Sequence, residues 1–104
     1  MVEISIEEFF NKVLEFDYVP FAQSPAWIKS RMSQGKSYRF FVDDVDNTQS
    51  VLAGERHSKP LIGELLLIEG GPVVKSPIQF QSLTRFLNDV TKQFDYVELN
   101  SSIL

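Results

Sequence analysis

The spacing of apolar and polar positions predicts three amphipathic helices. The first covers residues 5–16, which open with a Ser-x-x-Glu capping box and continue with apolar residues at helical spacing. A second helix is predicted from Ser24, a capping residue followed by Pro25 at the first helical position, to a left-handed cap at Gly35. The same Ser-Pro start opens the third and longest helix, residues 76–94.

Four segments rich in aromatic, β-branched or aliphatic residues predict strands. Three of them, residues 38–42, 50–57 and 61–69, are separated by short turns and should pair as an antiparallel meander. Residues 61–69 form the most apolar strand, and we expect it at the centre of the sheet. The fourth strand, residues 96–101, follows the long helix and should therefore lie parallel to the third.

The order of these elements predicts one α/β (α+β) domain over residues 1–104. It runs helix, helix, three strands, helix, strand, with an antiparallel three-strand meander plus a parallel final strand. Residues 17–23, between the first two helices, should run extended because Pro20 excludes a helix there. A chain of 104 residues suffices for one hydrophobic core.

Composition narrows the classes of function. The formal net charge of -4 argues against a protein that coats nucleic acid, which would need clustered Lys and Arg. The absence of Cys excludes disulfides, thiolate metal sites and a Cys nucleophile. The N-terminus does not resemble a signal peptide, and no apolar run is long enough to span a membrane. We expect a cytoplasmic protein without a metal ion.

Two polar features are better explained by a structural role in turns than by metal binding or catalysis. His57 is the only histidine and lies outside any cluster of metal-ligating residues, so we interpret it as a strand-end or turn residue. Asp43, Asp44 and Asp46 form an acidic run, but the Gly and the distal Glu of a calcium loop are absent. A solvated hairpin turn over residues 43–49 is the favoured interpretation.

The segment after the third strand is a candidate ligand-binding loop. Gly70 and Gly71 allow a close approach of the backbone, and the following helix start offers free N–H groups to an anion. Lys75 adds a positive charge and Ser76 the predicted cap. The segment is neither a P-loop nor a dinucleotide-binding fingerprint, and an ordinary turn remains the favoured alternative.

Gln23 and Trp27 form the other candidate pair. Gln23 lies just before the cap of the second helix, where it either contacts a substrate or, as buried amides usually do, hydrogen-bonds to backbone. Trp27 is expected to pack the second helix against the sheet.

Two of these segments resemble a known family. Residues 21–27 read F-A-Q-S-P-A-W and are similar to the F-x-Q-s-x-x-W opening of FemABX-type aminoacyltransferases. Residues 60–72 contain P-L-I-G followed by L-L-L-I-E-G-G-P, similar to the same family's P-x-x-G and G-P stretch. The order of the surrounding helices and strands also follows the family.

The resemblance implies the front portion of a GNAT-like acyltransferase fold. The acyl donor, an acyl-CoA or an aminoacyl-tRNA, would then lie against residues 61–69 and 70–76. Gln23, Trp27, Gly70, Gly71, Lys75 and Ser76 are the substrate-binding residues this implies, with tRNA and a peptidoglycan precursor as partners. No catalytic residue and no resident cofactor is evident.

This resemblance covers only part of the GNAT fold. The remaining helix and strands would follow Leu104, and the pyrophosphate loop of acetyl-CoA enzymes is missing. We therefore expect the chain not to catalyse alone. A splay between the third and last strands beside residues 70–76 would indicate a donor cleft, whereas tight pairing would indicate a plain scaffold.

The last strand suggests an alternative function. If no strand lies beyond residues 96–101, the outer side of this strand is unpaired, and Leu99 and the C-terminal Ile103 and Leu104 add apolar surface there. We expect a second copy or further chain to cover this edge. The chain is then a non-enzymatic interaction or dimerisation module, or, as a third hypothesis, a small-ligand binder that holds an anion at the helix start.

Overall fold

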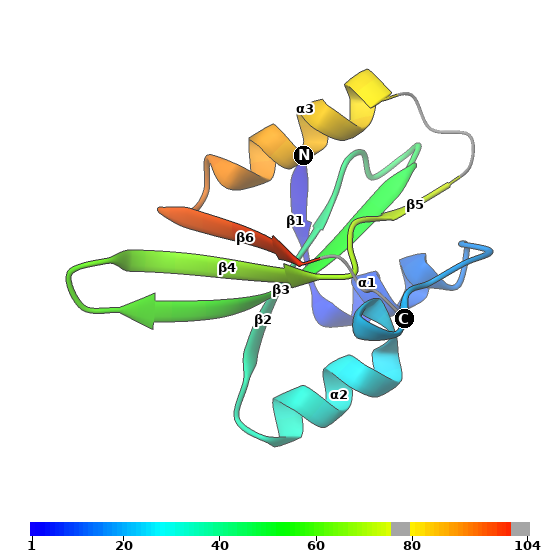
Figure 1. Ribbon diagram of the computed structural model, residues 1–104. Helices are drawn as coiled ribbons and strands as arrows, with labels where there is room; N and C mark the ends of the chain where they lie inside the picture. The colour runs from blue at the N-terminus through cyan, green and yellow to red at the C-terminus, as the bar shows by residue number, and fades with distance from the viewer. Residues whose placement is uncertain (76–79, 101–104) are drawn as a thin grey trace.

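The computed structural model describes residues 1–75 and 80–100 and contains helices on both faces of one mixed sheet (Figure 1). The α-helices are α1 (Ile6–Val13), α2 (Pro25–Ser33) and α3 (Phe80–Thr91), with a short 3-10 helix η1 (Phe21–Gln23) before α2. The strands are β1 (Val2–Ile4), β2 (Ser37–Val42), β3 (Ser50–Lys59), β4 (Gly63–Glu69), β5 (Val73–Val74) and β6 (Tyr96–Asn100).

The sheet has the strand order β1-β2-β3-β4-β6, and β5 pairs with β3 beyond the end of β4. Every neighbouring pair is antiparallel except β4–β6, which is parallel from Leu65 opposite Tyr96 to Glu69 opposite Asn100. This arrangement confirms the predicted fold class, with a meander followed by a helix and a parallel strand.

Two hydrophobic cores lie on opposite faces of the sheet. On one face, Phe9 and Val13 of α1 and Ile28 of α2 are buried against the inward residues of β2, β3 and β5. On the other face, Phe86 and Val90 of α3 are buried against β2, β3 and β4. The alternation of side chains along each strand supplies apolar residues to both cores.

Several predicted boundaries are corrected by the structure. The first helix ends at Val13 rather than residue 16, and residues 21–23 form a 3-10 turn where an extended chain was predicted. The third strand begins at Gly63, because Leu61 has a positive φ of 71° and belongs to the hairpin turn. The helix over 76–94 is described only from Phe80, and it ends at Thr91.

The position of the third predicted strand is also corrected. β3, not β4, lies at the centre of the sheet, with β2 on one side and β4 and β5 on the other. The apolar content of β4 has a different cause: Leu66 and Ile68 face the α3 core, and Leu65 and Leu67 lie half-buried on the other face. The short strands β1 and β5 were not predicted, because three- and two-residue segments carry too little periodicity to detect.

An ion pair fastens the edge strand β1 to β2. Arg39 donates from Nε and Nη2 to the two carboxylate oxygens of Glu3, each at 2.7 Å. Its guanidinium also lies 4.7 Å from the centre of the Phe94 ring, so the same side chain reaches from the edge strand to the segment after α3. These hydrogen bonds hold the pKa of the Glu3 carboxyl below its ordinary value of 4.5.

This contact predicts a pH-dependent contribution to stability. Because the pKa of Glu3 is lowered by folding, its contribution to the free energy of unfolding is present above pH 4.5 and is lost as the pH falls through the folded-state pKa. We expect Glu3→Gln to lower that free energy by about 0.5 kcal/mol at neutral pH, as for other half-exposed pairs, and less in acid. Urea unfolding at several pH values measures the difference. Glu98→Gln, which removes a carboxylate with no ion pair among the described residues, should show a smaller effect; a pH-independent Glu3→Gln effect would contradict the assignment.

Candidate functional site

The candidate site lies beside β3, where β4 ends and the chain continues to β5. β4 pairs with β3 from Glu55 onward, and β5 pairs with Ser50 and Val51. Between them the described strands leave a gap in the β3 ladder. The loop containing Gly70 and Gly71 spans this gap. The backbone groups that face the gap therefore need hydrogen-bond partners from another part of the chain.

The side-chain amide of Gln23 fills the gap. Nε2 donates to the carbonyl oxygen of Ala53 at 2.9 Å and to that of Glu69 at 2.8 Å, and Oε1 accepts from the Ala53 N–H at 2.8 Å. The amide thus replaces a strand peptide beside β3 and ties it to the end of β4. Gln23 is 1% exposed, so these bonds are shielded from water.

The glycine pair permits this arrangement. Gly70 has a positive φ of 68°, a conformation that glycine adopts without strain. A Cβ atom on Gly71 would lie 3.0 Å from Cδ and Nε2 of Gln23, closer than almost all real contacts. Gln23 and the two glycines are therefore brought together, and Gln23 contacts the glycine loop itself. Both amide hydrogens of Gln23 are already used, which leaves neither for a ligand.

The β4–β6 ladder is closed beside this loop. The register continues to Glu69 opposite Asn100, and the Gly70 N–H then donates to the Asn100 carbonyl oxygen at 2.9 Å. In the described residues the two strands do not splay, so there is no slot between them for an acyl donor. This is the geometry that the sequence analysis associated with a scaffold.

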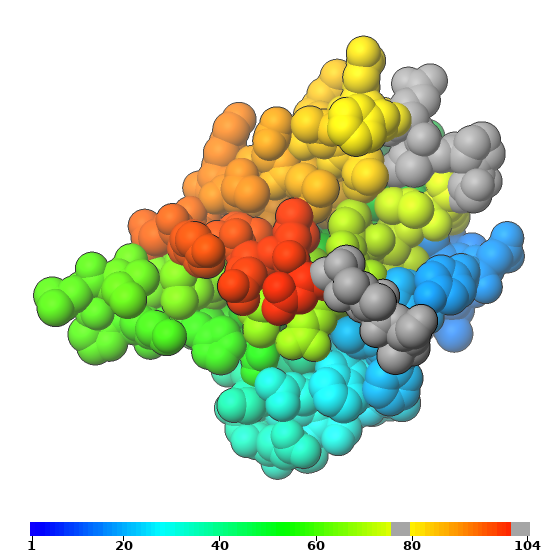
Figure 2. All heavy atoms as spheres, in the orientation of Figure 1, coloured from blue at the N-terminus to red at the C-terminus, as the bar shows by residue number. Residues whose placement is uncertain are grey.

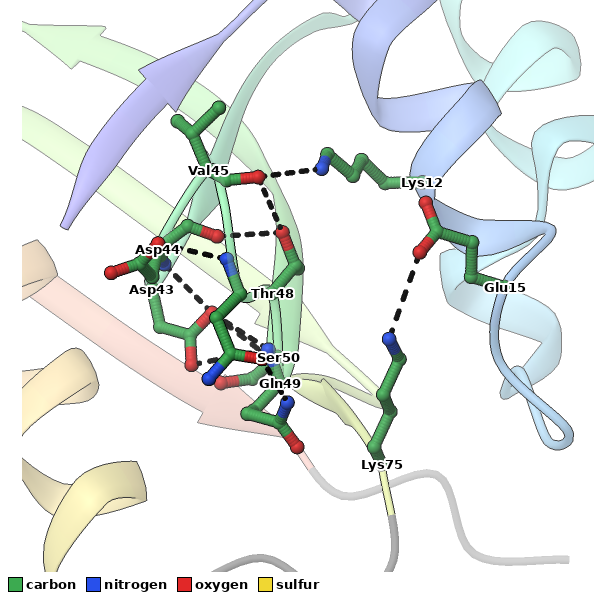
Figure 3. Close-up of polar contacts among 10 residues, drawn as sticks. Lys12, Glu15, Asp43, Asp44, Val45, Thr48, Gln49, Ser50 and Lys75 are labelled. Carbon is green, nitrogen blue, oxygen red and sulfur yellow. Dashed lines mark hydrogen bonds and ion pairs between the residues drawn. The ribbon is translucent and has the colours of Figure 1, made fainter.

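The other predicted site residues lie away from the glycines. Lys75 points towards the end of α1, where Nζ is 3.6 Å from Glu15 Oε1, and it borders a hollow of 230 Å³ (Figure 3). Trp27 is half-buried, and its ring centre lies 5.4 Å from that of Phe21. Ser76 and the predicted anion-binding start of the long helix lie outside the described residues.

A half-buried polar cluster beside α2 was missed by the sequence analysis. Arg31 Nη2 donates to both carboxylate oxygens of Glu55, at 3.0 and 3.2 Å, and His57 Nε2 lies 3.5 Å from Glu55 Oε2. The Glu55 side chain is 5% exposed. Burial, together with the negative charge of Glu55, raises the pKa of the nearby Tyr38 hydroxyl. Burial works to lower the pKa of Arg31, but the contacts with Glu55 and Tyr38 outweigh it and raise that pKa.

A simple pattern in the sequence could have revealed this cluster. Residues 51, 53, 55 and 57 share one face of β3, and that face is covered by α1 and α2. An acidic residue at position 55 therefore has to find a cation, because an unpaired buried carboxylate is costly. Arg31, in the last turn of the neighbouring helix, supplies it. The pair holds α2 to the sheet and leaves His57 half-exposed beside a hollow of 180 Å³.

The acidic run forms the hairpin turn that was predicted. Asp43 accepts hydrogen bonds from the backbone N–H groups of Asp44, Gln49 and Ser50 at 2.8 to 3.2 Å (Figure 3). Asp44 Oδ1 accepts from the N–H groups of Asn47 and Asp46, and these bonds lower the pKa of the Asp44 carboxyl. The carboxylates thus bind their own turn.

The comparisons with known proteins and the remaining polar groups of the described residues assign no further functional site. No family model and no curated protein matches the chain. Within residues 1–75 and 80–100, no group of three or more His, Cys, Asp or Glu side chains is placed to hold a metal ion. Over the same residues, no helix has the length and apolar character needed to cross a membrane.

The role of Gln23 yields a stability prediction. Gln23→Leu keeps the bulk of the side chain but leaves three backbone groups, on Ala53 and Glu69, without their hydrogen-bond partner. We expect the free energy of unfolding to fall by about 3 kcal/mol, since each buried unpaired group costs about 1–3 kcal/mol. Urea unfolding followed by Trp27 fluorescence measures the loss. Gln81→Leu, on the exposed face of α3, is the matched control, and equal effects of the two substitutions would contradict the bridging role.

Proposed function

We propose that this chain forms the front, donor-side portion of a GNAT-type acyl- or aminoacyltransferase domain and does not catalyse by itself. The observation that carries the proposal is the parallel β4–β6 pair with α3 between the two strands in the sequence, beside the antiparallel β2–β3–β4 meander. The FemABX resemblance implies this order, and its two sequence segments are brought together where Gln23 contacts the Gly71 loop. A fold alone does not specify an activity, so the proposal rests on the fold and the motifs together.

In this proposal the loop after β4 faces the donor, an acyl-CoA or an aminoacyl-tRNA. Gly70 and Gly71 keep the backbone free of side chains, and Lys75 contributes a positive charge. Ser76, outside the described residues, is the last residue that the proposal assigns to the donor. Gln23 positions the loop rather than binding the donor, and Trp27 supports α2. Coenzyme A esters and aminoacyl-tRNA are cytoplasmic, which makes the cytoplasm the proposed compartment. The acceptor would be a peptidoglycan precursor.

The absence of catalysis by the chain alone is part of the proposal. Transferases of this kind accelerate their reaction mainly by holding donor and acceptor in position. Because the β4–β6 ladder is closed, the donor would have to lie against the loop after β4, and the described residues supply no opposing wall there. The Glu55 carboxylate is engaged by Arg31 and is not free to act as a base.

Donor binding can be tested without any enzymatic assay. In an NMR titration with coenzyme A and with a short aminoacylated RNA, we expect the amide signals of Gly70, Gly71 and Lys75 to shift. Lys75→Ala should weaken binding about fivefold, the equivalent of roughly 1 kcal/mol for an exposed charge contact. Lys92→Ala, which removes an exposed lysine at the end of α3, should not. Absence of shifts at these amides with either ligand would rule out the donor-side role, and acyl transfer by the chain alone would contradict the proposal that it does not catalyse by itself.

A second candidate function is a non-enzymatic interaction or dimerisation module that uses β6. The observation in its favour is the exposure of Leu99 and Tyr96, 53% and 57%. Both belong to β6, which lies at the end of the described sheet and is seen at the surface of the molecule in Figure 2. Apolar surface on such an edge is typical of a strand that pairs with another chain.

If β6 mediates dimerisation, the apolar side chains at its edge determine whether the chain is a monomer or a dimer in solution. Light scattering at high concentration should give the mass of a dimer, and Leu99→Lys should return the monomer, because a charge at the edge opposes pairing. Leu14→Lys, at the exposed end of α1, should leave the dimer intact. A monomer at all concentrations would exclude dimerisation through this strand.

A further inference from the structure

The outer edge of β6 offers backbone groups in a regular order. The Asn100 carbonyl oxygen accepts from Gly70, at the end of β4, so the backbone groups of Asn100 point towards that strand. Successive residues of a strand direct their N–H and C=O groups to alternate sides. The N–H and C=O groups of Val97 and Leu99 therefore point away from β4, towards a side where none of residues 1–75 and 80–100 forms a strand.

The two edges of the sheet differ in how they resist pairing. β1 has only three residues, and Glu3 at its middle is held by Arg39. β6 has five residues without a Lys, a Pro or a glycine, the residues that commonly protect an edge. Within residues 1–75 and 80–100, β6 is therefore the edge that is open to strand addition.

The side chains of β6 define what an added strand would meet. Val97 and Leu99 lie on the α3 face, opposite Leu66 and Ile68 of β4. Tyr96, Glu98 and Asn100 lie on the other face. There, Tyr96 and Glu98 border the 180 Å³ hollow together with Leu65 and Leu67. An added strand would thus lie next to apolar side chains on both faces of the sheet. One of its own side chains would lie opposite the carboxylate of Glu98.

The negative charge of Glu98 distinguishes between a second copy of the chain and a basic peptide as the occupant of this edge. Glu98 makes no ion pair within the described residues, and the chain carries a net charge of -4. A second copy that pairs antiparallel about the middle of β6 would place Glu98 opposite Glu98 of its partner, and like charges directly opposite are destabilising. A Lys or Arg in that position would instead be stabilising.

We propose that the β6 edge binds an extended peptide segment of a partner protein by strand addition, with a Lys or Arg opposite Glu98 and apolar residues on either side. Main-chain hydrogen bonds to Val97 and Leu99 supply affinity, and the charge opposite Glu98 supplies selectivity. The proposal deepens the second candidate function by naming the partner's chemistry, and it requires no acyl donor.

Hydrogen exchange locates the peptide. The probe is a short synthetic peptide of alternating Val and Thr with a central Lys, compared with the same peptide carrying Glu. On saturation with the Lys peptide, the amides of Val97 and Leu99 should exchange more slowly, whereas that of Glu98, which already faces β4, should change little. Unchanged exchange at Val97 and Leu99 would overturn strand addition, whatever the result of the donor titration.

Charge reversal tests the selectivity. The unaltered chain should bind the Lys peptide about threefold more tightly than the Glu peptide, the range of a single cross-strand charge pair. Glu98→Lys should reverse this preference. Glu7→Lys, which changes the net charge equally on the distant helix α1, should keep it. Equal affinities for both peptides would overturn the role of Glu98, and a stable dimer without peptide would assign the edge to a second copy instead.

Discussion

The fold depends on one side-chain amide that takes the place of a strand. Where β4 leaves the sheet and β5 has not yet joined it, Gln23 supplies the donors and the acceptor that Ala53 and Glu69 would otherwise lack. An unpaired buried backbone group costs as much as a lost hydrogen bond, so the gap could not exist without such a partner. The same contact leaves little room for a side chain at Gly71 and fixes η1 against the centre of the sheet.

This constraint changes the meaning of the two segments that resemble FemABX proteins. The glutamine of one segment and the glycines of the other are in contact, and their contact is structural. A motif that resembles a binding site can thus serve to close a β-sheet. In the transferase proposal, the donor would meet a loop whose backbone is already held in place, which is a precondition for positioning a substrate.

The closed β4–β6 ladder and the open β6 edge are two consequences of the same arrangement. Parallel pairing to β4 supplies hydrogen-bond partners to one side of β6 as far as Asn100. The backbone groups of Val97 and Leu99 point to the other side, where none of the described residues forms a strand. The transferase proposal needs a further wall beside the loop, and the peptide proposal needs a further strand beside β6. Both describe a domain whose surfaces are completed by another segment of protein, and they differ in whether a donor molecule is also bound.

The sequence by itself determined the helices and long strands, the meander and the parallel last strand, because helical and strand periodicities and Ser-Pro caps are local signals. It also indicated that Gln23 and the glycines matter. Only the tertiary structure decided that their shared role is to bridge β3 and β4, that Lys75 turns to Glu15, and that Glu55 finds Arg31. These outcomes depend on which distant segments meet, and a hydrogen bond across thirty or more residues leaves no periodic trace in the sequence.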